Sequence, residues 1–139
     1  MTRLLFVSIY PEEYSRSGVV RSAISKVSRF DVEYFPIKNT KYAELKKYRS
    51  RLKKLKKEKG ILIIMSPSHI VTIFSRPFFR GPIILDAGWP LSDSSEIRKG
   101  KRSIEYLKTQ VLDRLSMRLA DLVLVETKSQ KEWLLKQKF

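Results

Sequence analysis

The chain has 139 residues, no cysteine, and 29 Lys and Arg against 14 Asp and Glu, which gives a formal charge of +15. This length suits one domain, and the lack of cysteine excludes a disulfide framework and a cysteine-based metal site. The longest apolar run, 61–65, is too short to cross a membrane, and the N-terminus lacks the length and cleavage site of a signal peptide. We therefore expect a cytoplasmic protein whose excess charge favours an anionic partner.

The N-terminal part alternates strand and helix patterns. Residues 3–10 form an apolar run without a helical period, which predicts a buried strand. A polar loop over 11–18 precedes a helical stripe that starts at Val20 and ends near Arg29. Residues 31–37 alternate and contain a proline, a pattern that fits an edge strand or the end of a strand.

The next segment, 38–59, holds 11 basic and two acidic residues, so it supplies +9 of the total charge of +15, and its pattern predicts a helix that Gly60 caps. An apolar stripe recurs every three or four residues and consists of Tyr42, Leu45, Tyr48, Leu52 and Leu55. The remaining face carries Lys46, Lys47, Arg49, Lys53, Lys54, Lys56 and Lys57. Three uses of this face stay open, namely a solvated surface, a surface that touches anionic lipid and a nucleic-acid surface.

The middle of the chain predicts two buried strands with a short helix between them. Residues 61–65 are wholly apolar, which suits a central parallel strand, and 83–86 form a second such run. Ser66-Pro67-Ser68 is a turn, in which Ser68 is placed to cap a helix that runs through Phe74. Residues 87–100 then predict a polar loop of about 14 residues, a length typical of functional loops.

The C-terminal part adds a helix, a strand and a last helix. The helix 102–119 has one apolar face, made of Ile104, Leu107, Val111, Leu115 and Leu119. Residues 121–125 form the fifth strand, and the helix over 127–138 begins with the capping-box pair Thr127 and Gln130 and has Trp133 and Leu134 on its apolar side. This alternation predicts a single α/β domain over 1–139, Rossmann-like, with an open parallel five-stranded sheet and helices on both faces.

In an open parallel sheet, ligands bind at the carboxyl ends of the strands, so the residues that follow each strand are the candidates for a site. After the first strand, Arg16, Ser17 and Gly18 stand at a helix start, where free N–H groups favour an anion; an ordinary helix start is the alternative. His69, the one histidine, follows the third strand and fits either proton transfer or side-chain packing. A single histidine without cysteine argues against a transition-metal site.

Acidic and aromatic residues follow the fourth and fifth strands. Asp86 comes directly after an apolar run, where a carboxylate fits a general base or a ligand for substrate hydroxyls; a turn-forming aspartate is the alternative. Trp89 is suited to stacking on a sugar ring, Asp93 lies in the same predicted loop, and Glu126 follows the last strand much as Asp86 follows the fourth. The sequence contains no dinucleotide fingerprint, P-loop or serine-hydrolase elbow.

The end of the chain resembles a known family. Ala120 to Thr127 (ADLVLVET), followed by 128–134 (KSQKEWL), is similar to the stretch that closes the N-terminal domain of GT-B fold glycosyltransferases of the glycosyltransferase 4 type, in which an AD-x-V strand leads into a Ser/Thr-capped helix. The helix 102–119 and the segment Pro82 to Asp86, with Trp89-Pro90 beyond it, are similar too. The likeness covers nearly the whole chain, and the order and spacing of the motifs carry it.

Two features depart from this family. Its loop after the first strand usually has paired glycines, of which only Gly18 is present here, and its fourth strand often ends in His-Asp, where this chain has Asp86 and Ala87. The resemblance implies the acceptor-side half of an enzyme that transfers a sugar from a nucleotide-sugar donor to a lipid-linked acceptor. The family's second Rossmann-like domain, which binds most of the donor, is not among these residues. We therefore expect the chain alone to be inactive and that donor-binding domain, fused or separate, to be its partner.

The resemblance also implies roles for the candidate residues. Asp86 would be catalytic, and the donor phosphates would lie near Arg16, Ser17 and Gly18. The acceptor site would be lined by His69, Trp89, Asp93 and Glu126. No metal or other cofactor is implied. The basic helix would hold the domain at an anionic membrane, which implies a peripheral position at the inner membrane face.

Two other interpretations compete with this one. A non-catalytic module that binds nucleic acid is favoured by the +9 segment, but the sequence has no recognisable nucleic-acid-binding motif. A flavodoxin-like regulatory or cofactor domain fits five parallel strands, but Ser66 stands where a receiver domain would place its phospho-acceptor aspartate. We rank the glycosyltransferase interpretation first.

Overall fold

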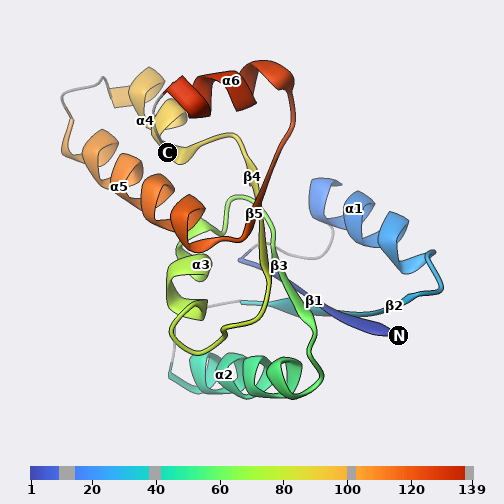
Figure 1. Ribbon diagram of the computed structural model, residues 1–139. Coiled ribbons are helices and arrows are strands. Elements are labelled where there is room, and N and C mark those ends of the chain that lie inside the picture. Colours follow the sequence, from blue (N-terminus) through green and yellow to red (C-terminus); the bar gives the residue numbers. More distant parts are fainter. Residues whose placement is uncertain (10–14, 38–41, 100–102, 137–139) are drawn as a thin grey trace.

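The computed structural model describes residues 1–9, 15–37, 42–99 and 103–136, which form five strands and six helices (Figure 1). The strands are β1 (Thr2–Ser8), β2 (Phe30–Pro36), β3 (Ile61–Ile64), β4 (Ile83–Gly88) and β5 (Leu122–Val125). The helices are α1 (Ser15–Ser25), α2 (Tyr42–Lys57), α3 (His69–Ser75), α4 (Leu91–Lys99), α5 (Ile104–Leu119) and α6 (Lys128–Lys136).

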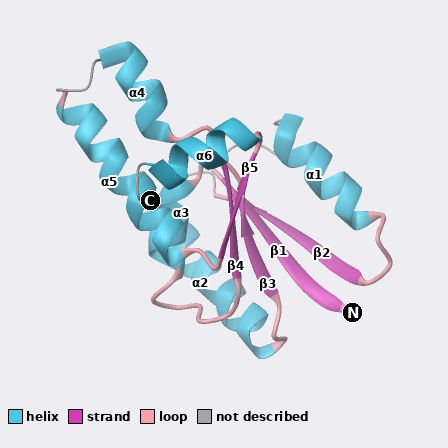
Figure 2. Ribbon diagram, turned by 45° about the horizontal axis from the view of Figure 1, so that its top comes forward, coloured by secondary structure: helices cyan, strands magenta, loops and turns pink. Residues whose placement is uncertain are grey.

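All five strands are parallel and lie in the order β2-β1-β3-β4-β5. The predicted α/β fold, an open parallel five-stranded sheet of Rossmann-like type with helices on both faces, is thereby confirmed (Figure 2). The order is that of doubly wound, flavodoxin-like sheets, in which the chain direction reverses between β1 and β3. The carboxyl ends of these two strands therefore border the crevice at which such sheets bind ligands.

The two faces of the sheet are covered unequally (Figure 2). One face packs against α2, α3, α5 and α6, and its buried cluster includes Leu5, Leu52, Ile64, Phe79, Leu85, Met117 and Leu134. The other face packs against α1 alone, through Leu4, Phe6, Ile63 and Met65. Because successive residues of β1 and β3 face opposite layers that are both dry, residues 4–7 of β1 and all of β3 are apolar rather than alternating.

The two edge strands differ in their protection. The proline-containing strand β2 is at an edge, as predicted, and its Asp31 and Glu33 both pair with Arg3 of β1. Charges and a terminal proline discourage further strand pairing. Strand β5, at the other edge, consists of four aliphatic residues, of which Leu122 is 52% and Leu124 is 41% exposed. The edge at β5 is thus apolar and carries no charged side chain.

Residues 87–100 do not form the predicted loop, because they contain the helix α4. The inner side of α4 is polar, with Ser92 and Ser95 buried. The hydroxyl and the backbone N–H of Ser92 each donate to Oδ2 of Asp113 on α5, at 2.8 Å. A helix that buries serines shows no apolar period, which is why the sequence pattern did not reveal it.

The apolar face of helix α5 does not pack on the domain. Its apolar stripe points to solvent, with exposed fractions between 45% and 71% for Ile104, Leu107, Val111 and Leu115. The side that packs on the domain instead buries Asp113, Ser116 and Met117. The spacing of apolar residues correctly predicted that this segment is a helix. The side of α5 that packs on the domain is determined by hydrogen bonds of buried polar residues, which the spacing of apolar residues does not reveal.

The C-terminal end of α2 differs from the prediction by one residue. Lys59, not Gly60, takes the left-handed conformation, with a φ of 51°. The Lys59 N–H donates to the Lys56 carbonyl at 3.2 Å and the Gly60 N–H donates to the Leu55 carbonyl at 2.9 Å, which is a Schellman cap. Glycine is required at position 60 for space, because a Cβ there would lie 2.4 Å from Leu55 Cδ1 and 2.7 Å from the Arg3 carbonyl oxygen.

We expect substitutions at these two neighbouring positions to act in opposite directions. Lys59→Gly removes the strain of a left-handed residue that carries a Cβ, so the free energy of unfolding should rise by roughly 0.5 to 1 kcal/mol. Gly60→Ala forces a methyl group against Leu55 and should lower it by about 1 to 3 kcal/mol. Urea unfolding followed by circular dichroism measures both, and a destabilised Lys59→Gly variant would contradict the cap described above.

Candidate functional site at the carboxyl edge of the sheet

The carboxyl ends of β3, β4 and β5 meet at Gly88. This residue has a φ of +53°, which favours glycine, and it pairs with Val125 across a register shift that follows Asp86. A Cβ at Gly88 would lie 2.7 Å from Oγ of Ser66 and 4.0 Å from Oε1 of Glu126. The side chains of Ser66, after β3, and Glu126, after β5, therefore approach each other beside Gly88, which has no side chain.

Two ionisable side chains are buried at this edge. Asp86 is 2% exposed and His69 is fully buried. Burial lowers the pKa of His69, and the charge of Asp113, the Pro67 carbonyl and the charge of Asp86 oppose this shift less strongly. The imidazole is therefore neutral at neutral pH, the form in which one ring nitrogen donates and the other accepts.

Asp113 of α5 connects three helices under this edge. Its carboxylate is fully buried and accepts from the Leu91 N–H at 3.2 Å as well as from the N–H and hydroxyl of Ser92. Asp113 thus caps the N-terminus of α4 from a different helix. Its Oδ1 lies 3.9 Å from Nε2 of His69, too far for a hydrogen bond, and its negative charge opposes the lowering of the His69 pKa by burial.

A buried serine hydroxyl links the end of β1 to the start of α3. The backbone N–H of Ile9, just after β1, donates to Oγ of Ser68 at 3.0 Å. Ser68 precedes α3, as predicted, but its hydroxyl makes no capping hydrogen bond to that helix. The hydroxyl links β1 to α3 instead.

A small aromatic cavity adjoins this edge at the start of α6. It has a volume of about 220 Å³ and is lined by Trp89, Pro90, Thr127, Ser129, Gln130 and Trp133. The predicted capping box is confirmed, because the Gln130 N–H donates to Oγ1 of Thr127 and the Thr127 N–H donates to Oε1 of Gln130, both at 3.1 Å. Trp89 is 56% exposed, so its ring is accessible to a ligand.

The structure brings four of the predicted site residues to one edge: Asp86, His69, Trp89 and Glu126. The predicted anion-binding residues Arg16, Ser17 and Gly18 lie within the first turn of α1 rather than in the loop before it. Asp93 lies in α4. The side chains of Arg16, Ser17 and Asp93 are outside the described part of the structure.

The predicted membrane or anion surface lies apart from this edge. All seven of its cations are exposed along α2, namely Lys46, Lys47, Arg49, Lys53, Lys54, Lys56 and Lys57. Because α2 ends just before β3 begins, it runs from the carboxyl edge toward the opposite edge of the sheet (Figure 1). This surface and the candidate site are therefore separate features of the molecule.

Sequence reasoning missed three residues that shape the site. Asp113 was hidden inside a helix whose apolar stripe dominated the pattern, although Asp113 and Ser116 stand three residues apart on its other side. Ser66 and Gly88 belong to strand ends that only the sheet register brings together. The available signal for Gly88 was its position between a buried strand and an exposed tryptophan.

Comparison of the chain with protein-family models, with curated proteins and with solved structures gave no match. Across the four described ranges, no helix combines the length and the apolar character that crossing a bilayer requires. In the same ranges, no three His, Cys, Asp or Glu side chains gather where they could hold a metal ion. Function must therefore be inferred from the geometry of the carboxyl edge and from the resemblance noted above.

We expect Asp113 to be the most sensitive polar position of this region. Asp113→Ala leaves the N–H groups of Leu91 and Ser92 without an acceptor, so the free energy of unfolding should fall by about 2 to 4 kcal/mol. Glu105→Ala removes an exposed carboxylate from the same helix and should change stability by roughly 0.5 kcal/mol or less. Urea unfolding compares the two variants, and equal stabilities would contradict the capping role.

We expect stability to fall in mild acid because of His69. The folded-state pKa lies below the ordinary value of 6.5, so between these two values the unfolded chain binds a proton that the folded chain does not. Stability should therefore decrease as pH falls through this window, by at most about 1.4 kcal/mol per pH unit from this group. Unfolding free energies measured across this range should show a flatter slope in His69→Gln, and an unchanged slope would assign the acid sensitivity elsewhere.

Proposed function

We propose that residues 1–139 form the acceptor-side domain of a glycosyltransferase that moves a sugar from a nucleotide-sugar donor to a lipid-linked acceptor. The observation that carries this proposal is the meeting of Asp86, Glu126 and Trp89 at the carboxyl edge of the sheet. Carboxylates accept hydrogen bonds from sugar hydroxyls, and an exposed indole offers a flat apolar face to a sugar ring. The resemblance of the segment 120–134 to glycosyltransferase domains points to the same chemistry.

Asp86 is the proposed general base for the acceptor hydroxyl. The carboxylate lies near the end of β4 and is 2% exposed. Gly88 has no side chain, which lets the Ser66 hydroxyl approach this strand end closely. His69, neutral and buried, lies near enough to feel the charge of Asp86, but its two ring nitrogens make no hydrogen bond within the described part of the structure.

The donor phosphates are proposed to bind at the start of α1. This helix of 11 residues begins after β1, so its free N–H groups and the positive end of its dipole face the carboxyl edge. Gly18 in its first turn allows a close approach to the backbone. The other contacts to the donor would come from a second Rossmann-like domain, which is the proposed partner of this one.

The test is sugar transfer by the chain alone and by the chain combined with a donor-binding domain, either fused to it or added separately. A panel of radiolabelled nucleotide sugars and extracted membrane lipids supplies donors and acceptors. We expect transfer only in the combination. Asp86→Asn should then reduce kcat by about 10²- to 10⁴-fold, the usual contribution of a general base.

Two further variants separate chemistry from binding. Trp89→Ala should raise the KM for the acceptor about tenfold with little change in kcat, because it removes a contact present before and during the reaction. Glu132→Gln, an exposed change on α6, serves as the control and should leave both constants unchanged. Absence of transfer with every donor in every combination, or full activity of Asp86→Asn, would overturn the proposal.

A further inference from the structure

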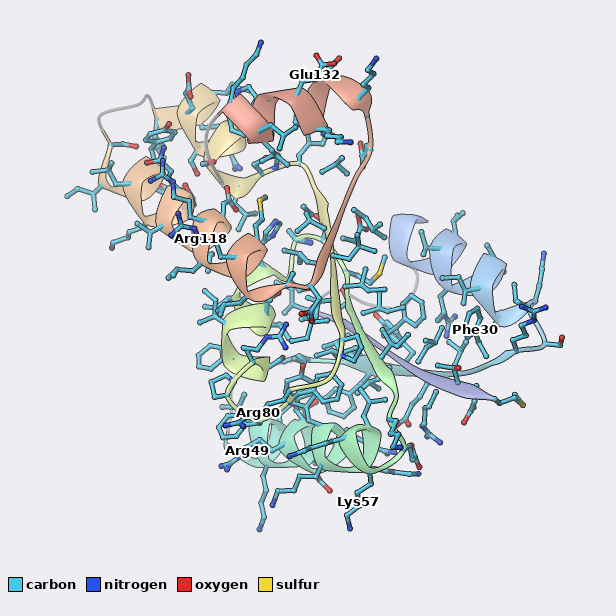
Figure 3. The ribbon with its side chains drawn as sticks, viewed as in Figure 1. Phe30, Arg49, Lys57, Arg80, Arg118 and Glu132 are labelled. Atoms are coloured by element: carbon cyan, nitrogen blue, oxygen red, sulfur yellow. The ribbon has the colours of Figure 1, made fainter. Side chains whose placement is uncertain are left out.

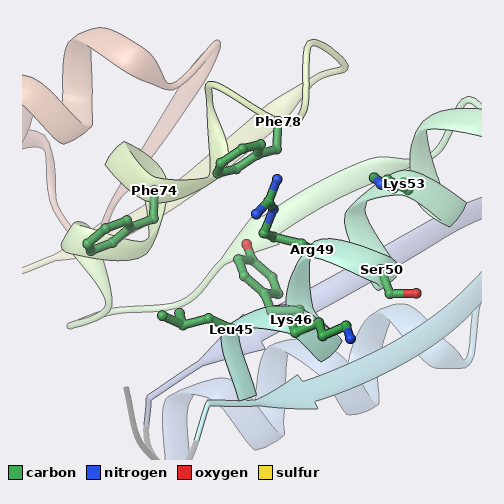
Figure 4. Close-up of a pocket in the computed structure, with 8 residues that line it drawn as sticks. Leu45, Lys46, Arg49, Ser50, Lys53, Phe74 and Phe78 are labelled. Atoms are coloured by element: carbon green, nitrogen blue, oxygen red, sulfur yellow. The ribbon is translucent and has the colours of Figure 1, made fainter. Parts of the chain in front are cut away.

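A groove on the outer surface between α2 and α3 has the chemistry of a site for an anionic amphiphile (Figure 4). Its volume is about 550 Å³, within the range of ligand sites in proteins. It is lined by Leu45, Lys46, Tyr48, Arg49, Ser50, Lys53, Phe74 and Phe78. None of these residues is acidic, and the three cations stand three and four residues apart along one side of α2.

The opposite wall of the groove exposes aromatic rings. Phe74 is 55% and Phe78 is 42% exposed, an unusual state for two large apolar side chains so close together. The Arg49 guanidinium lies 4.2 Å from the centroid of the Phe78 ring, so a cation is already held over an aromatic face (Figure 4). The groove therefore pairs positive charge with apolar surface along its whole length.

The floor of the groove is rigid. Tyr48 is 3% exposed, its hydroxyl is hydrogen-bonded to Oγ of Ser75 on α3, and its ring stacks on Phe35 at 5.7 Å between centroids. Burial raises the pKa of the Tyr48 hydroxyl, so the floor carries no charge. A fixed floor means that the groove is already formed before a ligand arrives, which lowers the entropic cost of binding.

The apolar surface continues across α3 onto α5. Ile70 of α3 is 44% exposed, and α3 lies between α2 and α5 in the same helical layer. The outward stripe of α5 is apolar, as described above, and is accompanied by the exposed cations Lys108, Arg114 and Arg118. Figure 3 shows Arg49 and Arg118 on the same side of the molecule as α3.

We propose that this outer face of α2, α3 and α5 docks on an anionic phospholipid bilayer, with lipid headgroups at Lys46, Arg49 and Lys53 and the rings of Phe74 and Phe78 inserted among the acyl chains. Cations beside a large apolar face are the signature of interfacial membrane binding. Of the seven exposed cations of α2, only the three that border the groove would contact lipid headgroups. This docking does not depend on the proposed sugar transfer, and its test does not measure that reaction.

The charge of this face and its mixture of aromatic and aliphatic side chains favour a bilayer over a second copy of the chain or a nucleic acid. A second copy of this chain would bring its own Lys and Arg against those of the first, since the formal charge of each copy is +15. A single-stranded nucleic acid would match the cations and the rings, but the aliphatic side chains of Ile70, Leu107 and Val111 offer no stacking surface for bases. A bilayer accommodates charge, rings and aliphatic chains together.

The experiment is flotation of the full chain with vesicles of phosphatidylcholine, with and without phosphatidylglycerol. Binding should require phosphatidylglycerol and weaken with added salt. The double variant Lys46→Gln, Lys53→Gln should bind about 30-fold more weakly, which is about 2 kcal/mol at about 1 kcal/mol for each cation at an anionic surface. The matched control Lys56→Gln, Lys57→Gln removes the same charge from the same helix outside the groove, and its binding should fall only about threefold or less.

Insertion of the rings is tested separately. Phe74→Trp should show a blue-shifted tryptophan emission on phosphatidylglycerol vesicles relative to the unsubstituted chain, because the new indole leaves water. Phe74→Ala combined with Phe78→Ala should abolish flotation while unfolding at a similar urea concentration. Equal weakening by the two lysine pairs, an unshifted emission, or binding of a single-stranded oligonucleotide in place of vesicles would each overturn the proposal.

Discussion

One buried carboxylate, that of Asp113, determines how the second half of the chain packs. Its two oxygens take the N–H groups at the start of α4 and the hydroxyl of Ser92, so α5 must turn its polar side inward to supply them. The apolar side of α5 is then directed away from the core and is exposed to water. An unsatisfied buried carboxylate costs more than an exposed aliphatic side chain, and this difference explains the orientation of α5. The position of His69 beside the same carboxylate links that choice to the candidate site.

Much of the fold was predictable because it depends on local patterns and on backbone geometry. Wholly apolar runs marked β1, β3 and β4, and alternation of strands with helices predicted a parallel sheet. The Thr127 and Gln130 pair marked the start of α6, since a capping box involves residues only three apart. The helix α4 and the inward side of α5 were not predictable, because both depend on hydrogen bonds between residues about 21 apart in the chain.

Part of the candidate site was likewise predictable from the sequence and part of it was not. Asp86, Trp89 and Glu126 could be chosen from the sequence because each stands at or just beyond the end of a predicted strand, and parallel strands end at one edge. Burial of His69 and the near contact of Ser66, Gly88 and Glu126 depend on sheet register and on one left-handed residue, which composition does not encode. The charge of α2 could be counted from its residues, but the side chains that pack beside it could not be identified in that way. Only the packing of α3 against α2 separates the cations that border aromatic rings from those that face water alone.

The two edges of the sheet differ in how readily a further strand could be added to them. At β2 the carboxylates of Asp31 and Glu33 and the terminal proline oppose any incoming strand. At β5 four aliphatic residues present open backbone groups with no charge to repel a partner. Addition of a further strand is therefore favoured at β5 over β2. Any strand added at β5 would continue the sheet beside the aromatic cavity and the start of α6, whereas without one the same edge is the place where aggregation of the folded chain would begin.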